Sequence, residues 1–141
     1  MKKTLLILVA VVSIYFISGI ASAFLLEHKA ENYMQLALED ISKPWSVSEL
    51  NDRASIWMLK KAKLTPQKIV DLSSQELGSF IRFNQKPDCI LQQGYISHSA
   101  TKSTWTVCVN YAKFEKKSVA LKIRLIQENG SWKINDFISV N

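Results

Sequence analysis

The start of the chain constrains its fold most strongly. Thr4–Leu26 is an uncharged stretch of 23 residues that follows Lys2 and Lys3 and precedes a charged flank beginning at Glu27. An α-helix rises ~1.5 Å per residue, so a helix of this length can cross a hydrocarbon core of ~30 Å. The two lysines favour an N-terminus on the cytoplasmic side. The sequence therefore predicts a single-pass anchor in a bacterial inner membrane, with residues 27–141 forming one periplasmic domain.

The same stretch also fits a cleavable signal peptide. Its apolar region would be Leu5–Ile17, and Ala21-Ser22-Ala23 has the small-x-small form of a signal peptidase site, with cleavage between Ala23 and Phe24. The apolar run continues past this point without a helix-breaking residue, which favours a retained anchor. Both alternatives deliver the domain to the outer side, and cleavage would release it into the periplasm or the medium.

The charge of the exported part argues against a nucleic-acid partner. The chain carries a formal net charge of +6, and +4 remains without Lys2 and Lys3, since 16 basic residues then face 12 acidic ones. The basic residues are spread along the chain and form no dense run of the kind found in nucleic-acid-binding arms. The predicted partners are the membrane, through Thr4–Leu26, and one or more proteins, with a homodimer as one option.

The first half of the domain is predicted to be helical. Apolar residues recur at helical spacing over Glu27–Ser42, so this helix would continue the membrane segment until the Lys-Pro pair that follows ends it. A second helix is predicted over Ser46–Lys63, because Ser46 and the glutamate three residues later have the spacing of a capping box. A third, shorter helix is predicted between Thr65-Pro66 and Gly78.

From Ser79 the spacing of apolar residues changes to two, which is typical of strands. The predicted strands are Ser79–Asn84, Asp88–Ile96, Thr104–Phe114, Ser118–Gln127 and Ser131–Val140. Helices followed by an antiparallel meander predict an α+β fold, in which about three helices pack on a curved sheet of four to five strands.

The last turn sets the register of the final hairpin. Asn129-Gly130 is a pair that a two-residue type I′ turn prefers, because both positions need a positive φ. The two residues of each facing pair are then equally far in sequence from the centre of the turn, and one face of the hairpin is apolar. The predicted pairs are Leu125 with Ile134, Ile123 with Asp136, Leu121 with Ile138, and Val119 with Val140.

The two cysteines, Cys89 and Cys108, are equidistant from a hairpin centre between His98 and Ser99. Facing residues on adjacent strands have Cβ atoms roughly 4.5–5.5 Å apart, which is near the range of a disulfide. An exported domain lies in an oxidising compartment. The spacing therefore predicts a Cys89–Cys108 disulfide, and the alternative is a pair of free thiols.

A catalytic centre would have to be built around Asp136. In the register above, Asp136 lies opposite Ile123 on the apolar face, where burial penalises its charge, as in isomerases of the ketosteroid type. Tyr111 is the hydrogen-bond donor that such a site would use. Alternatively, a bulge in the last strand turns Asp136 outward, or Arg82 or Arg124 pairs with it at the rim. The cysteines and histidines lack the spacing of a metal site, so no metal or cofactor is predicted.

Several of these features occur together in one fold family. Leu77-Gly78 enters a strand, the strands Trp105–Phe114 and Val119–Leu125 follow, and the last hairpin reads Asn129-Gly130-Ser131-Trp132-Lys133-Ile134-Asn135-Asp136-Phe137. Over roughly residues 30–141 this arrangement resembles the nuclear-transport-factor-2-like, or cystatin-like, domains, whose last hairpin often reads Asn/Asp-Gly-x-Trp-Lys-Ile-x-x-Phe. The resemblance implies a cone-shaped α+β domain and selects no function, because this fold hosts enzymes, ligand binders and assembly subunits.

Three functions from different classes fit these observations. The first is a non-enzymatic, membrane-tethered domain that binds a protein in an envelope assembly. Its architecture is similar to that of the bitopic subunit of type IV secretion systems, with a shorter body and only three residues before the membrane segment. The second is a domain that binds a small ligand inside the cone, and the third is an isomerase or lyase that works through Asp136. We favour the first.

Overall fold

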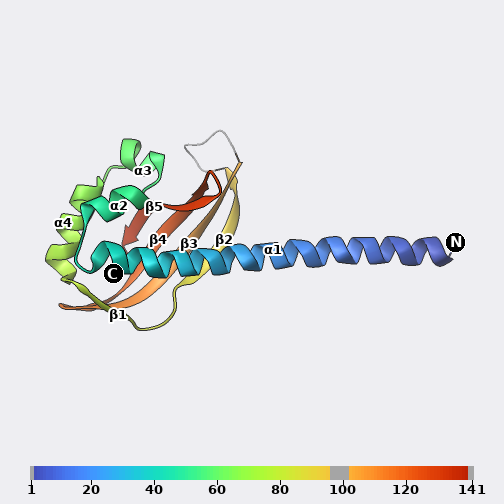
Figure 1. The fold of residues 1–141 in the computed structure, drawn as a ribbon, viewed down its shortest axis with the longest axis horizontal. Helices are drawn as coiled ribbons and strands as arrows, with labels where there is room; N and C mark the ends of the chain where they lie inside the picture. The colour runs from blue at the N-terminus through green and yellow to red at the C-terminus, as the bar shows by residue number, and fades with distance from the viewer. Residues whose placement is uncertain (1, 96–101, 140–141) are drawn as a thin grey trace.

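The computed structural model describes residues 2–95 and 102–139 and has an α+β fold, as the sequence predicts (Figure 1). One very long helix comes first, short helices follow, and antiparallel strands complete the chain. The elements are α1 Lys2–Ser42, α2 Val47–Arg53, α3 Ile56–Lys61, α4 Pro66–Leu77, β1 Phe80–Phe83, β2 Asp88–Tyr95, β3 Lys102–Phe114, β4 Ser118–Glu128 and β5 Ser131–Ser139. The predicted strand ends at Ile96 and Val140 lie outside the described residues.

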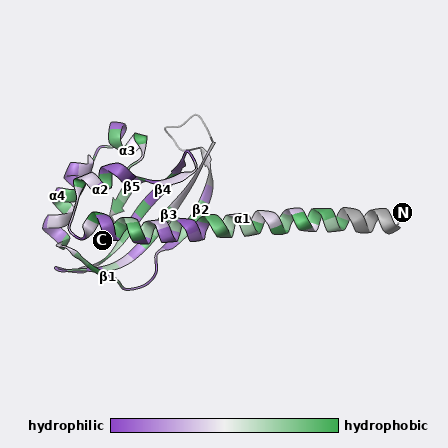
Figure 2. Cartoon of the chain, in the orientation of Figure 1, coloured by the Kyte–Doolittle hydropathy of each residue, from purple (hydrophilic) through white to green (hydrophobic). Residues whose placement is uncertain are grey.

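Helix α1 joins the apolar N-terminal segment to the domain without a break. Its first half protrudes and is hydrophobic, whereas its second half lies across the sheet (Figures 1 and 2). The second half is the predicted amphipathic helix, and its apolar side is buried in the core through Ala30, Met34, Ala37, Leu38 and Ile41. The helix that fits a membrane segment is therefore also the central helix of the domain.

The sheet is open, and all of its strand pairs are antiparallel. Its strand order is β1-β3-β4-β5. The long strand β3 pairs with two strands along the same edge: its first part pairs with β2 and its last part with β1. Side chains alternate between the two faces of a strand. The face toward α1 holds the buried residues of β3 and β4, among them Thr106, Cys108, Ala112, Phe114, Ile123 and Leu125.

The predicted second helix, Ser46–Lys63, is wrong in its extent, because the chain forms two short helices, α2 and α3, there. Between them, Ala54 and Ser55 are extended and buried, and the backbone N–H of Ser55 donates to the carbonyl oxygen of Ile134 at 2.7 Å. The linker thus pairs with the edge of β5, as a parallel bridge between Ala54 and Ile134. A partner on a distant strand overrides the local helical pattern.

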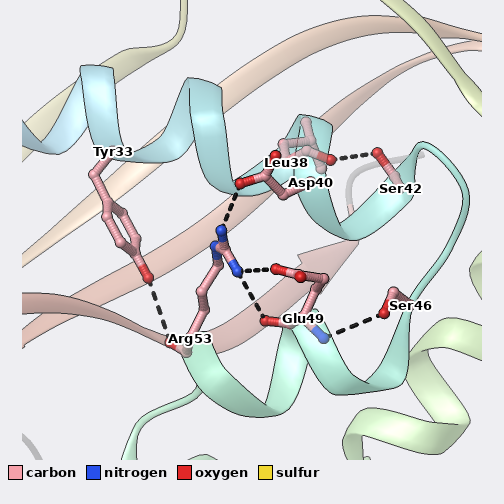
Figure 3. A network of polar contacts seen from close by, with 7 residues as sticks. All are labelled: Tyr33, Leu38, Asp40, Ser42, Ser46, Glu49 and Arg53. Atoms are coloured by element: carbon pink, nitrogen blue, oxygen red, sulfur yellow. Dashed lines mark hydrogen bonds and ion pairs between the residues drawn. The ribbon is translucent and has the colours of Figure 1, made fainter.

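Arg53 joins α2 to α1 (Figure 3). Its guanidinium forms ion pairs with Glu49 in its own helix and with Asp40 in α1. The hydroxyl of Tyr33 on α1 donates to the backbone oxygen of Arg53 at 3.4 Å. Ser46 caps α2 as predicted, since its side chain accepts a hydrogen bond from the N–H of Glu49. These contacts dock the short helix α2 against the end of α1.

The β4–β5 hairpin follows the predicted turn and only part of the predicted register. Asn129 and Gly130 have φ values of 52° and 77°, as a turn with positive φ at both positions requires, and Leu125 pairs with Ile134. Beyond that pair a bulge shifts the register by one residue. The predicted pairs of Ile123 with Asp136 and Leu121 with Ile138 are therefore wrong, whereas the predicted partner of Val119 lies outside the described residues. The observed pairs are Arg124 with Asp136, Ile123 with Phe137, Lys122 with Ile138, and Leu121 with Ser139.

The extra residue of the bulge is Asn135, which is fully buried. Its side-chain oxygen accepts a hydrogen bond of 2.9 Å from the hydroxyl of Ser55, and the same hydroxyl oxygen accepts one of 3.0 Å from the backbone N–H of Met58. Ser55 therefore caps α3 and links the helix to the bulge in β5. The bulge turns Phe137 toward the core side and Asp136 away from it.

The contact between Ser55 and Asn135 is testable by a double-mutant cycle. Ser55→Ala and Asn135→Ala should each lower the free energy of unfolding by about 1–3 kcal/mol, because each leaves a buried polar group without its partner. The double variant should lose less than the sum, with a coupling of about 1 kcal/mol. Urea unfolding of the full chain in detergent, followed by tryptophan fluorescence, measures these values. Strictly additive losses would contradict the contact.

The structure contains the predicted disulfide between Cys89 and Cys108. The two residues face each other in the register of β2 and β3, and their side chains are 4% and 0% exposed. The bond links β2, which lies at an edge of the sheet, to the central strand β3 on the core side. A disulfide is typical of proteins in oxidising compartments.

Replacing both cysteines by alanine should lower the free energy of unfolding by about 2–4 kcal/mol, because the reduced chain gains conformational freedom in the unfolded state. Adding a reductant should destabilise the wild-type chain by a similar amount and leave the double variant unchanged. Equal midpoints of urea unfolding for oxidised wild type and double variant would contradict a bond that stabilises the fold.

Candidate interaction surface and groove

One face of the sheet carries no helix within the described residues. We call it the uncovered face; it comprises the residues of β2–β5 that alternate with those facing α1. The described helices lie on the other side of the sheet or at its β5 edge, where the linker between α2 and α3 pairs with Ile134. On the uncovered face Ile90 is 59% and Tyr111 is 42% exposed. Such exposure of large apolar side chains on a sheet marks a candidate for contact with another molecule.

The centre of the uncovered face is apolar. Val107 pairs with Ile90 on β2, Val109 follows two residues later, and the stripe ends at Tyr111. Ala120 on β4 lies beside Tyr111, its partner in the β3–β4 register. The neighbouring charged residues are mainly basic, namely Arg82, Lys113, Lys122 and Arg124 against Asp88 and Asp136. The uncovered face therefore combines an apolar stripe with an excess of positive charge.

Arg124 lies between an aromatic ring and a carboxylate on this face. Its guanidinium carbon is 5.5 Å from the centroid of the Trp105 ring, and its Nη1 is 3.9 Å from Oδ2 of Asp136. The cation is attracted by the face of the ring as well as by the carboxylate. Aromatic residues and arginine are the types enriched in protein–protein interfaces. This cluster borders the apolar stripe, because Arg124 is the β4 partner of Val107.

The structure does not bring together the residues of the predicted catalytic centre. The side chain of Asp136 is 40% exposed and pairs with Arg124, as in the alternative with a bulge, so the prediction that it lies on the apolar face is wrong. Tyr111 shares the uncovered face but lies four residues along β3 from Val107, the partner of Arg124, or roughly 13 Å along the strand. Arg82 is on β1, which pairs with β3 at the edge of the sheet opposite β5. Asp136 and Tyr111 therefore lie too far apart to act together on one group of a substrate.

Asp136→Leu tests this orientation. On the uncovered face the substitution removes a partly exposed ion pair, so the free energy of unfolding should fall by less than about 1 kcal/mol. On the apolar face it would instead replace a buried carboxylate by a packed hydrocarbon and raise the stability. Urea unfolding of the full chain distinguishes the two by the sign of the change. A clear gain in stability would contradict the bulged register.

A groove of about 580 Å³ lies between α4 and the β4–β5 part of the sheet. Residues of three segments form its apolar lining, including Leu64, Ile69, Leu72, Leu77, Leu121 and Phe137. Its polar side chains are Ser73, Glu76 and Lys117, whereas Ser118 and Lys122 border it from β4 with side chains that alternate onto the uncovered face. Leu64 and Leu72 are 44% and 49% exposed, so part of the apolar wall is open to solvent. The volume is within the roughly 300–1,000 Å³ that small-molecule sites occupy.

The protruding half of α1 is a third candidate surface. Among the described residues, α1 is the helix that is long and apolar enough to cross a membrane. Its large apolar side chains are 47% to 80% exposed over Val9, Val11, Val12, Ile14, Tyr15, Phe16, Ile17, Ile20, Phe24 and Leu25. The predicted cleavage point between Ala23 and Phe24 lies inside the continuous helix. The segment fits a membrane anchor or a signal helix.

Comparison with protein-family models, with curated proteins and with solved structures found no match. Within the described residues, no group of three or more His, Cys, Asp or Glu side chains could hold a metal ion. The uncovered face had a sequence signal in the alternation of β3, but the groove had none, because it depends on where α4 lies against β4.

Proposed function

We propose that this chain is a membrane-anchored, extracytoplasmic domain that binds a protein partner in an assembly of the cell envelope. The observation that carries the proposal is the uncovered face, where the apolar side chains of Ile90 and Tyr111 are exposed on the same face as Arg124 and Trp105. Burying such a stripe against a partner is favourable because it removes apolar area from water. The excess of basic residues around the stripe favours a partner surface that carries carboxylates.

The location in this proposal is the periplasmic side of a bacterial inner membrane. Lys2 and Lys3 before the apolar segment support the orientation, and the Cys89–Cys108 disulfide supports an oxidising compartment. The continuity of α1 through Ala23 supports a retained anchor over a cleaved signal. The open sheet crossed by a helix also supports the proposed relation to the nuclear-transport-factor-2-like, or cystatin-like, domains.

A pair of matched isoleucine substitutions tests the partner surface. Ile90 on the uncovered face and Ile56 on α3 are 59% and 58% exposed. Ile90→Glu should reduce the amount of co-purified partner at least tenfold, because it places a charge in the apolar stripe, whereas Ile56→Glu should leave it unchanged. A tenfold loss corresponds to about 1.4 kcal/mol, which is typical of residues that matter in an interface.

The measurement is affinity purification from mild-detergent membranes at native expression, with quantitative mass spectrometry of the recovered proteins. Circular dichroism of each purified variant checks that the domain is folded. Equal recovery of all partners with Ile90→Glu and Ile56→Glu would contradict the uncovered face as the binding surface. A chain that begins at Phe24 and is recovered alone would contradict the anchored assembly subunit.

A further inference from the structure

The outer edge of β2 lies where the apolar segment of α1 ends. The uncharged stretch of the helix runs to Leu26, and Glu27 is the first charged residue after it. The side chain of Glu27 accepts a hydrogen bond of 3.2 Å from the backbone N–H of Leu91 in β2. Figure 1 shows the strands following one another along α1, with β2 nearest to the protruding half and β3 and β4 farther from it. The free edge of β2 therefore faces the protruding half of the helix.

A bilayer around the apolar segment would bring β2 into its headgroup layer. The hydrocarbon core is ~30 Å thick and the whole bilayer ~40–45 Å, which leaves about 5–7 Å of headgroups on each side. Because α1 rises ~1.5 Å per residue, this layer extends from Glu27 to about Glu31. Lys86, in the connection between β1 and β2, pairs with Glu31 at 3.1 Å and lies at the same depth. Neighbouring strands are about 4.8 Å apart, so β4 lies beyond the layer.

The edge of β2 lacks the usual devices that protect an exposed edge strand. Over Asp88–Tyr95 the register with β3 is continuous, without a bulge, and the sequence contains no proline, lysine or arginine. Such devices hinder the free backbone groups of an edge from pairing with another chain. The opposite edge of the sheet is covered, because Ser55 pairs with Ile134 of β5. A layer of headgroups beside β2 would shield its edge in a different way.

We infer that the outer edge of β2 rests in the phospholipid headgroup layer of the membrane that holds α1. The inference rests on the retained anchor of the proposed function and adds a lipid surface to its contacts. Near this depth Glu27 and Glu31 offset Lys29 and Lys86, so no excess of positive charge is present and the contact should not require anionic lipid. Side chains stand roughly perpendicular to a sheet, so Ile90 would remain open to a protein partner beside the domain.

The test compares two exposed glutamines in the full chain. Gln92 lies in β2, whereas Gln75 lies in α4, at the end of the domain opposite the protruding half of α1 (Figure 1). Each is replaced by cysteine and labelled with a fluorophore in phosphatidylcholine nanodiscs, with and without a lipid that carries a nitroxide quencher on its headgroup. The label in Gln92→Cys should lose more than half of its fluorescence to the nitroxide, and the label in Gln75→Cys should lose almost none. Added phosphatidylglycerol should change neither loss.

An insertion of one helical turn changes the height of the domain and leaves the domain itself intact. Four residues, Glu-Ala-Ala-Lys, between Leu25 and Leu26 lift the domain by about 6 Å and rotate it by about 40°. Leu26 packs against the core and therefore stays with the domain. The loss of fluorescence at Gln92 should fall at least twofold, because β2 then leaves the headgroup layer, and the loss at Gln75 should stay the same. Circular dichroism checks that the chain with the insertion is folded.

Two results would overturn the inference: equal losses at Gln92 and Gln75, or a loss at Gln92 that the insertion leaves unchanged. A third label, in Ser18→Cys, tests the anchor separately, because a nitroxide in the acyl chain of the lipid should quench it. Without this quenching the retained anchor is wrong, and the inference with it. If the label at Ser18 is quenched by the acyl-chain nitroxide and the label at Gln92 is not quenched by the headgroup nitroxide, only the headgroup contact is wrong and the proposed function stands.

Discussion

The second half of α1 is the constraint on which the rest of the domain depends. Its buried side chains, from Ala30 to Ile41, cover one face of the sheet, and Arg53 and Tyr33 dock α2 against the same helix. Helix α1 also contacts β2, because the side chain of Glu27 accepts a hydrogen bond from the backbone N–H of Leu91 at 3.2 Å. Since the same helix continues into the apolar segment, the domain has no linker at which it could turn freely relative to a membrane.

This arrangement gives the domain two sides with different roles in our account. The side toward α1 holds the mainly apolar core and, beside α4, the groove, whereas the other side of the sheet exposes Ile90 and Tyr111 beside Arg124. A continuous helix would hold the uncovered face at one orientation to the membrane. That orientation would suit a subunit that presents a fixed surface to a neighbour.

Local chemistry made much of the fold predictable. The positive φ values at Asn129 and Gly130, the cap at Ser46 and the disulfide between Cys89 and Cys108 each follow from residue types and short-range spacing. The sequence offered the bulge in β5 only as an alternative and did not predict the break before α3, because both depend on the contact of Ser55 with Asn135, 80 residues later. The same bulge decides that Asp136 faces solvent, so the candidate catalytic centre failed for want of a long-range contact. The groove depends on tertiary packing that no local pattern contains.

The continuity of α1 is the central claim, and electron–electron distance spectroscopy tests it most directly. Ser18→Cys and Leu36→Cys place spin labels at exposed positions 18 residues apart, and the native cysteines are held in their disulfide. In nanodiscs, one straight helix predicts a single narrow distribution of distances near about 27 Å, since 18 residues make five turns. A broad distribution, or one with a clearly shorter mean, would reveal a hinge between the membrane segment and the domain and would contradict the account.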